Sequence, residues 1–352
     1  MSLFTFLGLA QFGAAPSGAR LARIKQSPNY KNGAFHNQSI TPDLTGGATY
    51  FSVIMKFFFG KSQAALPKHV IPSTYTDLKL LSPTENVFIW FGHSSYFIQV
   101  DGMRFLIDPV LSGYASPFSF TTKSFKGTDR YKVEDLPEID VLLLTHDHYD
   151  HLDYNAIKAL KNKVKRVVTG LGTGAHLELW GYEPERITEL DWYEALTLSD
   201  SFTLTATPAR HFSGRGFKRN QALWVSYVLQ TPTKKLFLGG DSGYDFHFAA
   251  IGKKYGPFDW AIIENGQYDA FWQHIHLMPD EQLKAAQELQ TKNLIPVHSG
   301  KFSLGNHAWD EPLELLIQNN ESVQLPIATP MIGERLDLNA TTQSFRYWWR
   351  TM

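Results

Sequence analysis

The stretch LLLTHDHYDHLD, residues 142–153, places four potential metal ligands within six consecutive positions, directly after an apolar run. The apolar run predicts a short buried strand, because it contains only a few residues, all apolar, and polar residues follow it at once. Alternate side chains of an extended chain share a face, so His146 and His148 can converge on one cation. Asp150 and His151 then turn toward a second cation. The stretch therefore predicts two adjoining metal sites that are supplied by one loop.

The composition is that of a large globular protein, with 352 residues of which 43% are hydrophobic and 14% aromatic. This length is compatible with one large domain or two smaller ones. The formal net charge of -1 provides no overall field to gather nucleic acid. There is no cysteine, which excludes disulfides, thiolate metal sites and cysteine nucleophiles. Any metal must be held by His, Asp and Glu, a set that suits zinc, iron or manganese.

Residues 1–85 predict an irregular N-terminal extension that wraps the core, because prolines and scattered glycines interrupt any sustained period. Met1–Ala15 lacks a positively charged start and a long apolar centre, so we expect mature protein without a signal peptide or membrane span. A soluble or peripherally membrane-bound protein is expected, with a cytoplasmic location favoured. Tyr50–Gly60, YFSVIMKFFFG, is the most apolar stretch of the extension. It predicts either a packing segment or a lipid-facing lip.

From residue 86 onward, strands and helices alternate as in a mixed α/β protein. The predicted strands are Val87–Phe91, Ser95–Val100, Met103–Ile107, Val141–Leu144, Arg166–Thr169, Phe202–Thr207, Leu223–Leu229, Lys235–Leu238, Asp259–Ile263 and Leu294–Val297. The predicted helices are Tyr154–Asn162, Thr173–Trp180, Phe246–Tyr255 and Pro279–Gln290. This alternation predicts two packed sheets flanked by helices, in one catalytic domain over residues 86–352.

Three later elements also place imidazole or carboxylate groups after short strands, where loops present functional groups above a rigid scaffold. They are PARH at 208–211, GGDSGY at 239–244 and PVHSG at 296–300. The predicted ligands are His146, His148 and His211 for one cation, Asp150, His151 and His298 for the other, and Asp241 as a bridge between both. Two cations about 3.5 to 4 Å apart can hold a bridging hydroxide and stabilise the attacking and departing oxygens. The ligand set therefore predicts hydrolysis.

The motif HxHxDH at 146–151, with the later ligands, resembles the metallo-β-lactamase superfamily of binuclear hydrolases. Similarity to one branch extends through WFGHS at 90–94, IDP at 107–109, residues 145–154, ELDW at 189–192, GDSGY at 240–244 and GPFD at 256–259. These motifs resemble the N-acylphosphatidylethanolamine-hydrolysing phospholipase D family, and SPNY at 27–30 resembles extensions of its bacterial relatives. The resemblance implies an αββα sandwich, two zinc ions and a phosphodiester substrate.

The resemblance also implies roles for individual residues. Asp150 and Asp241 are the expected catalytic carboxylates, because they would hold the metals that activate water. His276, just ahead of a predicted helix, resembles a family position beside the substrate phosphate, where it would donate a proton or contact phosphate. His93 and Asp108 lie in family-like motifs and are interpreted as hydrogen-bond partners of the ligands rather than as ligands.

Other residues near the motif keep two interpretations. Tyr244 is a candidate substrate contact, with simple packing as the alternative. His307 competes with His298 for the last ligand place, and His298 is preferred because it directly follows a strand. His307 is then a candidate pocket residue. The basic run of Arg210, Arg215, Lys218 and Arg219 predicts either a solvated loop or a contact to phosphate.

The predicted activity is that of a zinc-dependent phosphodiesterase of phospholipase D type, acting on N-acylphosphatidylethanolamine-like lipids through a metal-bridging hydroxide. One alternative is a lactonase of the sugar-phosphate type in the same superfamily. Another is a non-catalytic metal-binding or membrane-associated protein. The expected partners are a lipid or small phosphodiester and a peripheral membrane contact. A homodimer is compatible with the sequence, and nucleic acid is not expected.

One short segment differs from the branch. Ile263-Glu264-Asn265 stands where the branch has more apolar residues. This difference affects the prediction of the substrate and leaves the prediction of metal-dependent hydrolysis unchanged.

Overall fold

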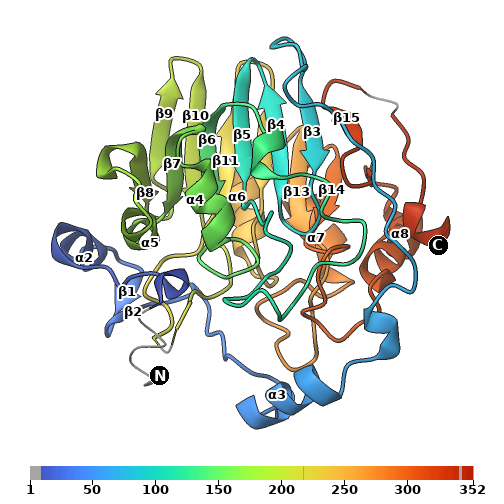
Figure 1. Ribbon diagram of the computed structural model, residues 1–352, viewed down its shortest axis with the longest axis horizontal. Helices are drawn as coiled ribbons and strands as arrows, with labels where there is room; N and C mark the ends of the chain where they lie inside the picture. Colours follow the sequence, from blue (N-terminus) through green and yellow to red (C-terminus); the bar gives the residue numbers. More distant parts are fainter. Residues whose placement is uncertain (1–8, 217, 341–342, 352) are drawn as a thin grey trace.

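The computed structural model describes residues 9–216, 218–340 and 343–351. Two β-sheets form the centre of the molecule, and helices lie outside them (Figure 1). The strands of the first sheet are β3 Val87–Trp90, β4 Tyr96–Val100, β5 Met103–Ile107, β6 Ile139–Leu144, β7 Val164–Gly170, β8 Ile187–Leu190 and β15 Arg335–Asp337. The strands of the second sheet are β9 Ala195–Ser199, β10 Phe202–Thr207, β11 Ser226–Gln230, β12 Lys235–Leu238, β13 Trp260–Glu264 and β14 Leu294–Val297.

The helices follow the predicted alternation over most of the chain. They are α2 Gly18–Ile24, α3 Tyr50–Phe59, α4 Tyr154–Leu160, α5 Gly174–Leu179, α6 His247–Tyr255, α7 Glu281–Glu288 and α8 Glu311–Val323. A small hairpin joins β1 Tyr30–Lys31 to β2 Ala34–Phe35. Short 3-10 helices occur at η1 Ala10–Phe12, η2 Gln63–Ala65, η3 Val133–Asp135, η4 Pro184–Arg186 and η5 Trp348–Thr351. None of the helices in the described part of the chain is long and apolar enough to cross a membrane.

Both sheets are mixed. The first sheet runs in the order β15-β3-β4-β5-β6-β7-β8, with β5 to β8 parallel and the other pairs antiparallel. The second runs β14-β13-β12-β11-β10-β9, with β12 to β14 parallel and the other pairs antiparallel. Parallel strands have their carboxyl ends at the same edge of a sheet, which brings the loops after β6, β12, β13 and β14 toward one side of the sandwich. These loops carry most of the predicted ligands.

The sequence locates most of these strands closely. The predicted strands Met103–Ile107, Phe202–Thr207, Lys235–Leu238 and Leu294–Val297 are observed with the same bounds as β5, β10, β12 and β14. The predicted pattern lacks the strands β1, β2, β8, β9 and β15 and the helices α2, α3 and α8, so the described part of the N-terminal extension, residues 9–85, is less irregular than predicted. β9 reads ALTLS, and its alternation of exposed and half-buried residues at a sheet edge gives a weaker signal than a buried apolar run.

The main core lies between the two sheets and combines side chains from both, among them Phe105 and Val168 of the first sheet with Leu204 and Leu236 of the second. Tyr227 of β11 is fully buried, and its hydroxyl donates to the Leu144 carbonyl at the end of β6, at 2.9 Å. A buried Tyr hydroxyl requires such a partner, so this bond fixes the position of the second sheet directly beneath the HxHxDH loop.

The N-terminal arm, residues 9–85, lies along the outside of this sandwich (Figure 1). Of the predicted mature segment Met1–Ala15, the first eight residues lie outside the described part of the chain. Arg20 of α2 attaches the arm to the core, because its guanidinium donates to Glu189 at 2.6 Å and to Glu178 at 2.9 and 2.7 Å. Further along, Asn37 accepts from the His211 amide at 3.1 Å and donates to its carbonyl at 2.8 Å. The arm therefore braces a predicted metal ligand.

Replacing Arg20 tests this attachment. We expect Arg20→Ala to lower the free energy of unfolding by about 1.5 to 3 kcal/mol, because it removes three hydrogen bonds between charged, partly buried groups. The matched control is Arg23→Ala, whose half-exposed partner is Glu194 and which should cost at most about 1 kcal/mol. Urea denaturation followed by circular dichroism measures both. Equal losses in the two variants would contradict an anchoring role for Arg20.

Candidate metal centre

The loop that follows β6 brings three imidazoles into one cluster. His146 Nε2 lies 3.0 Å from His148 Nδ1, and His211 Nε2 lies 3.2 Å from the same atom. His211 comes from the loop after β10 and is oriented by a 2.8 Å contact between its Nδ1 and the Ile275 carbonyl oxygen. One nitrogen from each of the three rings lies within 4.8 Å of the others. The structure therefore brings together His146, His148 and His211, which the sequence assigns to one cation.

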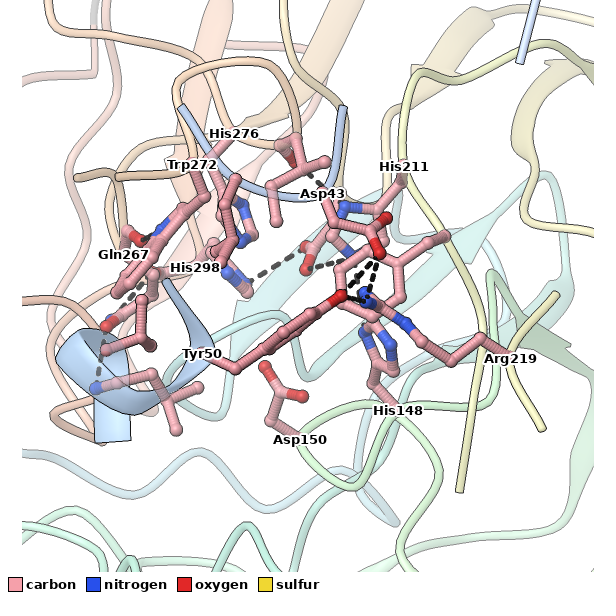
Figure 2. A pocket seen from close by; sticks show the side chains of 16 residues that line it. Asp43, Tyr50, His148, Asp150, His211, Arg219, Gln267, Trp272, His276 and His298 are labelled. Atoms are coloured by element: carbon pink, nitrogen blue, oxygen red, sulfur yellow. Dashed lines mark hydrogen bonds and ion pairs between the residues drawn. The ribbon is translucent and has the colours of Figure 1, made fainter. Parts of the chain in front are cut away.

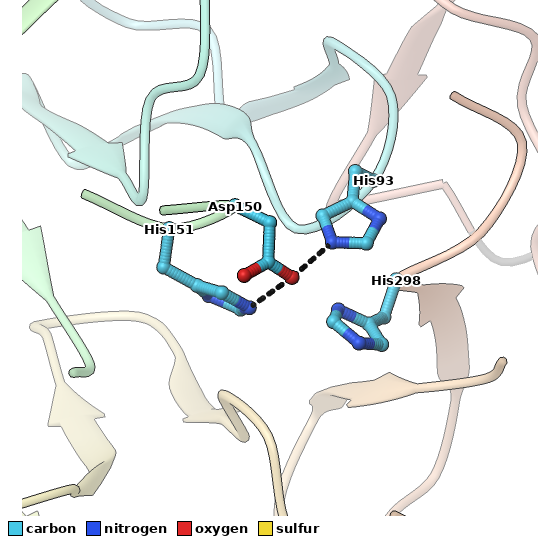
Figure 3. Close-up of side chains that lie close together, drawn as sticks. All are labelled: His93, Asp150, His151 and His298. Atoms are coloured by element: carbon cyan, nitrogen blue, oxygen red, sulfur yellow. Dashed lines mark hydrogen bonds and ion pairs between the residues drawn. The ribbon is translucent and has the colours of Figure 1, made fainter. Parts of the chain in front are cut away.

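A second cluster contains the remaining pair from the loop. His93, Asp150, His151 and His298 each offer an atom within 4.8 Å of the others (Figure 3). Asp150 Oδ2 lies 2.8 Å from His93 Nε2 and 3.5 Å from His151 Nε2. His298 follows β14 directly, as predicted, and its Nδ1 is 2.8 Å from Ser94 Oγ. His93 thus contacts a predicted ligand, as its interpretation as a hydrogen-bond partner expects, and its ring also belongs to a group that could hold a metal ion.

Asp241 lies between the two clusters. Its Oδ2 is 3.1 Å from His151 Nε2, 3.7 Å from His211 Nε2 and 3.8 Å from His146 Nε2. Its Oδ1 is 3.1 Å from His298 Nδ1. One carboxylate thus faces imidazoles of both sets, which is the arrangement that a bridging ligand requires.

The backbone before Asp241 explains how it reaches this place. Gly240 has a φ of 61°, and a Cβ at this residue would lie 2.8 Å from the Thr145 Cβ. Only glycine accepts this conformation without strain at so close an approach. The loop after β12 can therefore pack directly against Thr145, the residue that immediately precedes the HxHxDH motif.

Asp108 holds this arrangement from behind. Its Oδ2 lies 2.8 Å from His151 Nδ1, and it accepts hydrogen bonds from the Thr145 amide at 2.9 Å and the Thr145 hydroxyl at 2.6 Å. A carboxylate on the far nitrogen of an imidazole fixes its tautomer and orientation, so that the other nitrogen faces the cation. The interpretation of Asp108 as a hydrogen-bond partner of a ligand is confirmed.

The electrostatics favour neutral imidazoles at every predicted histidine ligand except His151. Burial lowers the pKa of His148 to about 4 and holds the pKa of His146, His211 and His298 well below the ordinary histidine value. Burial also acts to lower the pKa of His151, but the charges of Asp241, Asp150 and Asp108 outweigh it and raise that pKa. Burial raises the pKa of Asp241 to about 7. Neutral imidazole is the form that binds a cation, and a buried carboxylate needs a compensating charge.

Several buried atoms of the cluster lack a hydrogen-bond partner among the described residues. They are His93 Nδ1, His151 Nε2, Asp241 Oδ1 and His298 Nε2. Buried polar atoms are normally satisfied, so this group of orphaned atoms in the imidazole clusters indicates a missing partner. The donors are all nitrogen or carboxylate oxygen, which suits zinc, iron or manganese. The residues present therefore fit a metal centre.

Glu264 is a residue that the sequence motifs do not identify as functional. It ends β13 and is almost fully buried, and its Oε2 lies 2.6 Å from His276 Nδ1. The amides of Leu277 and Ser242 donate to its Oε1 at 2.7 and 3.2 Å. Burial raises the pKa of Glu264 well above its ordinary value despite these two bonds. The signal in the sequence was a carboxylate directly after a buried apolar strand.

A cavity of about 280 Å³ opens over both clusters (Figure 2). It reaches His148, Asp150, His211, Asp241 and His298, together with His276. The rest of its lining is Asp43, Leu44, Tyr50, Val53, Phe212, Arg219, Gln267, Trp272, Ile275 and Leu304. Asp43 to Val53 belong to the N-terminal arm, so residues far away in sequence complete the wall of the site.

The two other predicted substrate residues lie elsewhere. The Tyr244 hydroxyl donates to Glu288 at 2.6 Å, and its ring stacks on Phe248. His307 accepts at Nε2 from the Gln267 amide at 2.7 Å, and its ring packs at a tilt against that of Tyr268. Neither residue is part of the cavity lining. The structure therefore does not bring Tyr244 or His307 to the cavity, because their side chains are occupied by packing and by the shaping of loops.

Comparison with known proteins gives the family. The model described as "Beta-lactamase superfamily domain" matches residues 103–299, a range that includes all seven predicted ligands together with Asp108 and His276.

The chain belongs to the β-lactamase superfamily. The whole predicted ligand set therefore falls within the superfamily domain.

Relatives of this superfamily member confirm the predicted branch resemblance. An uncharacterised protein of Mycobacterium tuberculosis is 35% identical over 345 residues, covering 97% of this chain and 92% of the relative. The N-acyl-phosphatidylethanolamine-hydrolyzing phospholipase D 1 of Caenorhabditis elegans is 34% identical over 268 residues, covering 70% of this chain and 74% of the relative. Together with the His/Asp clusters, membership makes this chain a metal-dependent hydrolase of the superfamily.

The fold is also found among solved structures. The metallo hydrolase Igni18 of Ignicoccus hospitalis superposes with a TM-score of 0.56 at 18% identity, covering 71% of this chain and 97% of that one. The predicted sandwich of two mixed sheets flanked by helices is confirmed.

Replacing Asp108 tests the support of the metal centre. We expect Asp108→Asn to weaken zinc binding by about 10- to 100-fold, because His151 loses the carboxylate that orients it. Competition with a fluorescent zinc chelator measures the affinity. The control is Asp153→Asn, a buried carboxylate that caps α4 and touches no imidazole, and its zinc affinity should stay within about threefold of wild type. Unchanged affinity in Asp108→Asn would contradict the role assigned to Asp108.

Proposed function

We propose that this hydrolase is a phosphodiesterase of phospholipase D type that acts on N-acylphosphatidylethanolamine-like lipids and contacts the membrane peripherally. The observation that carries the proposal is the position of α3, an apolar helix that borders the cavity above the His/Asp clusters. Tyr50 and Val53 of α3 line the cavity, while Phe51 and Ile54 are 73% and 53% exposed. An exposed apolar face beside an active-site mouth suits a substrate that is held in a lipid surface.

The attachment of α3 supports this interpretation. Lys56 Nζ donates to Asp269 at 3.1 Å and lies 4.4 Å from the centre of the Phe271 ring. The polar side of the helix is thereby tied to the loop that carries Trp272, leaving the apolar side outward. α3 projects from the body of the molecule at the bottom of Figure 1. Of the two sequence interpretations of Tyr50–Gly60, the exposed side chains favour a lipid-facing lip.

The lining of the cavity also suits an apolar substrate. Leu44, Val53, Phe212, Ile275 and Leu304 contribute apolar side chains beside the charged floor. A sugar-phosphate lactone would need a small polar pocket instead. The similarity to the C. elegans phospholipase D supports the same substrate class.

In the proposed reaction the seven predicted ligands would hold two cations. When bound, the cations would supply activated water and neutralise charge on the phosphate oxygens. Asp108, Thr145 and Ser94 keep the ligand side chains oriented. The raised pKa of Glu264 fits a protonated carboxyl that donates to His276 Nδ1, which leaves the proton of the neutral imidazole on Nε2. Nε2 can then give this proton to the leaving oxygen while Nδ1 takes the proton of Glu264. Cleavage of the phosphorus–oxygen bond would release an N-acylethanolamine and a phosphatidic acid.

The test is release of N-acylethanolamine from mixed micelles of N-acylphosphatidylethanolamine, measured by mass spectrometry with zinc-loaded protein. We expect wild type to release it and Asp241→Asn to lose activity. His276→Gln should reduce kcat by about 10²- to 10⁴-fold, the usual contribution of a general acid. If wild type released nothing from the lipid but opened a sugar-phosphate lactone, the lactonase would replace the phospholipase.

The role of α3 is tested separately. Ile54→Asp should lower the rate on lipid vesicles at least fivefold, because it places a charge on the membrane-facing side, and leave the rate on soluble bis(4-nitrophenyl) phosphate unchanged. Leu80→Asp is the matched control, since Leu80 is 81% exposed and lies outside the cavity lining. Equal effects of the two substitutions on vesicles would remove α3 from the proposal.

A further inference from the structure

The cavity mouth contains a guanidinium that the metal chemistry does not use. Among the described residues that line the cavity, Arg219 is the only arginine or lysine. Its guanidinium stacks on the Phe212 ring at 3.9 Å, and the Phe212 ring centre is 4.3 Å from that of His148. Arg219 is therefore held one aromatic ring away from the first imidazole cluster (Figure 2).

The neighbouring basic residues have structural roles. The Arg210 guanidinium donates to the Ile40 carbonyl, the Thr41 hydroxyl and the Tyr244 carbonyl, each at 3.0 Å. The buried Arg215 donates to the backbone carbonyls of Gln11, Asp147 and Leu152. Lys218 lines a different pocket beside residues 12–16. Of the basic run noted in the sequence, Arg219 alone faces the substrate cavity.

Two residues of the N-terminal arm meet Arg219 at the mouth. Asp43 Oδ2 accepts from Arg219 Nη1 at 2.8 Å and from the Tyr50 hydroxyl at 2.6 Å. The ion pair is not buried, because the side chains of Arg219 and Asp43 are 32% and 47% exposed. A partly exposed pair of this kind contributes little to stability, so it can be exchanged for another anion. A phosphodiester offers the same oxygen acceptors as the Asp43 carboxylate.

We propose that Arg219 recognises the phosphodiester anion of the substrate as it enters the cavity, and that Asp43 occupies the guanidinium as an internal counterion until then. This specificity role rests on the proposed phosphodiesterase function. Entry of the substrate breaks the bond between Asp43 and Arg219, and Phe212 keeps the guanidinium stacked in place. Tyr50 then remains hydrogen-bonded to Asp43, which returns when the product leaves.

Binding of dibutyl phosphate, a soluble diester anion, tests the role of Arg219. We expect Arg219→Gln to raise the Kd about tenfold in calorimetry with zinc-loaded protein, because a charge-assisted hydrogen bond is lost. Tributyl phosphate carries three butyl chains and no charge, and its Kd should stay within about twofold of the wild-type value. Arg219→Lys should restore part of the anion affinity, since it keeps the charge without the planar fork. The same order is expected in chelator-treated protein, where no metal contributes.

Substitution of Asp43 tests the proposal independently. Asp43→Asn should lower the Kd for dibutyl phosphate about two- to fivefold, the range of an exposed ion pair. In the Arg219→Gln background it should have no effect, because Asp43 acts only through Arg219. Arg186→Gln removes the same charge from an exposed surface site paired with Glu183 and is the charge-matched control.

Three results would overturn the proposal. They are an unchanged Kd for dibutyl phosphate in Arg219→Gln, equal losses for dibutyl and tributyl phosphate, and an effect of Asp43→Asn that persists without Arg219. Tighter binding of inorganic phosphate than of dibutyl phosphate would replace the diester site with a general phosphate site. Failure of the lipid assay with the binding series intact would refute the lipid substrate and leave the anion site standing.

Discussion

Burial of the Asp241 carboxylate among imidazoles is the constraint on which the site depends. A charge removed from water needs a compensating partner, and Asp241 has His151, His211, His146 and His298 within 3.1 to 3.8 Å. Burial raises the pKa of Asp241 and lowers that of most of the histidines, so the cluster by itself is poorly compensated. Cations bound between these groups would compensate the charge of the buried Asp241 carboxylate and bind the neutral imidazoles.

The sandwich provides the rigidity for this convergence. The parallel strands of each sheet end on one side, and Tyr227 joins the sheets by its bond to the Leu144 carbonyl immediately before the ligand loop. Asp108 then orients His151 and Thr145, while Gly240 allows the Asp241 loop to approach within contact distance. The N-terminal arm adds the outer wall, since Asn37 holds the His211 backbone. The residues that hold the sheets and loops together thus also position the metal ligands.

The sequence predicts the local part of this site well and the distant part poorly. Ligands that follow buried strands are predictable, because a strand end fixes where the next side chains emerge, and His298 is such a case. Asp43 and Tyr50 were not predictable as cavity residues, because only the tertiary path of the arm brings them to Arg219. Tyr244 lies three residues after Asp241, yet its side chain turns to Glu288. Proximity in sequence does not determine the direction of a side chain.

The most direct test of the two-metal centre is the zinc content of the purified protein, measured by mass spectrometry after dialysis against metal-free buffer. Two clusters joined by Asp241 predict about two zinc ions per chain in wild type and fewer than about one in Asp241→Asn, because the shared carboxylate serves both cations. A wild-type protein that retains one ion or none, or an Asp241→Asn variant that retains two, would contradict the binuclear assignment.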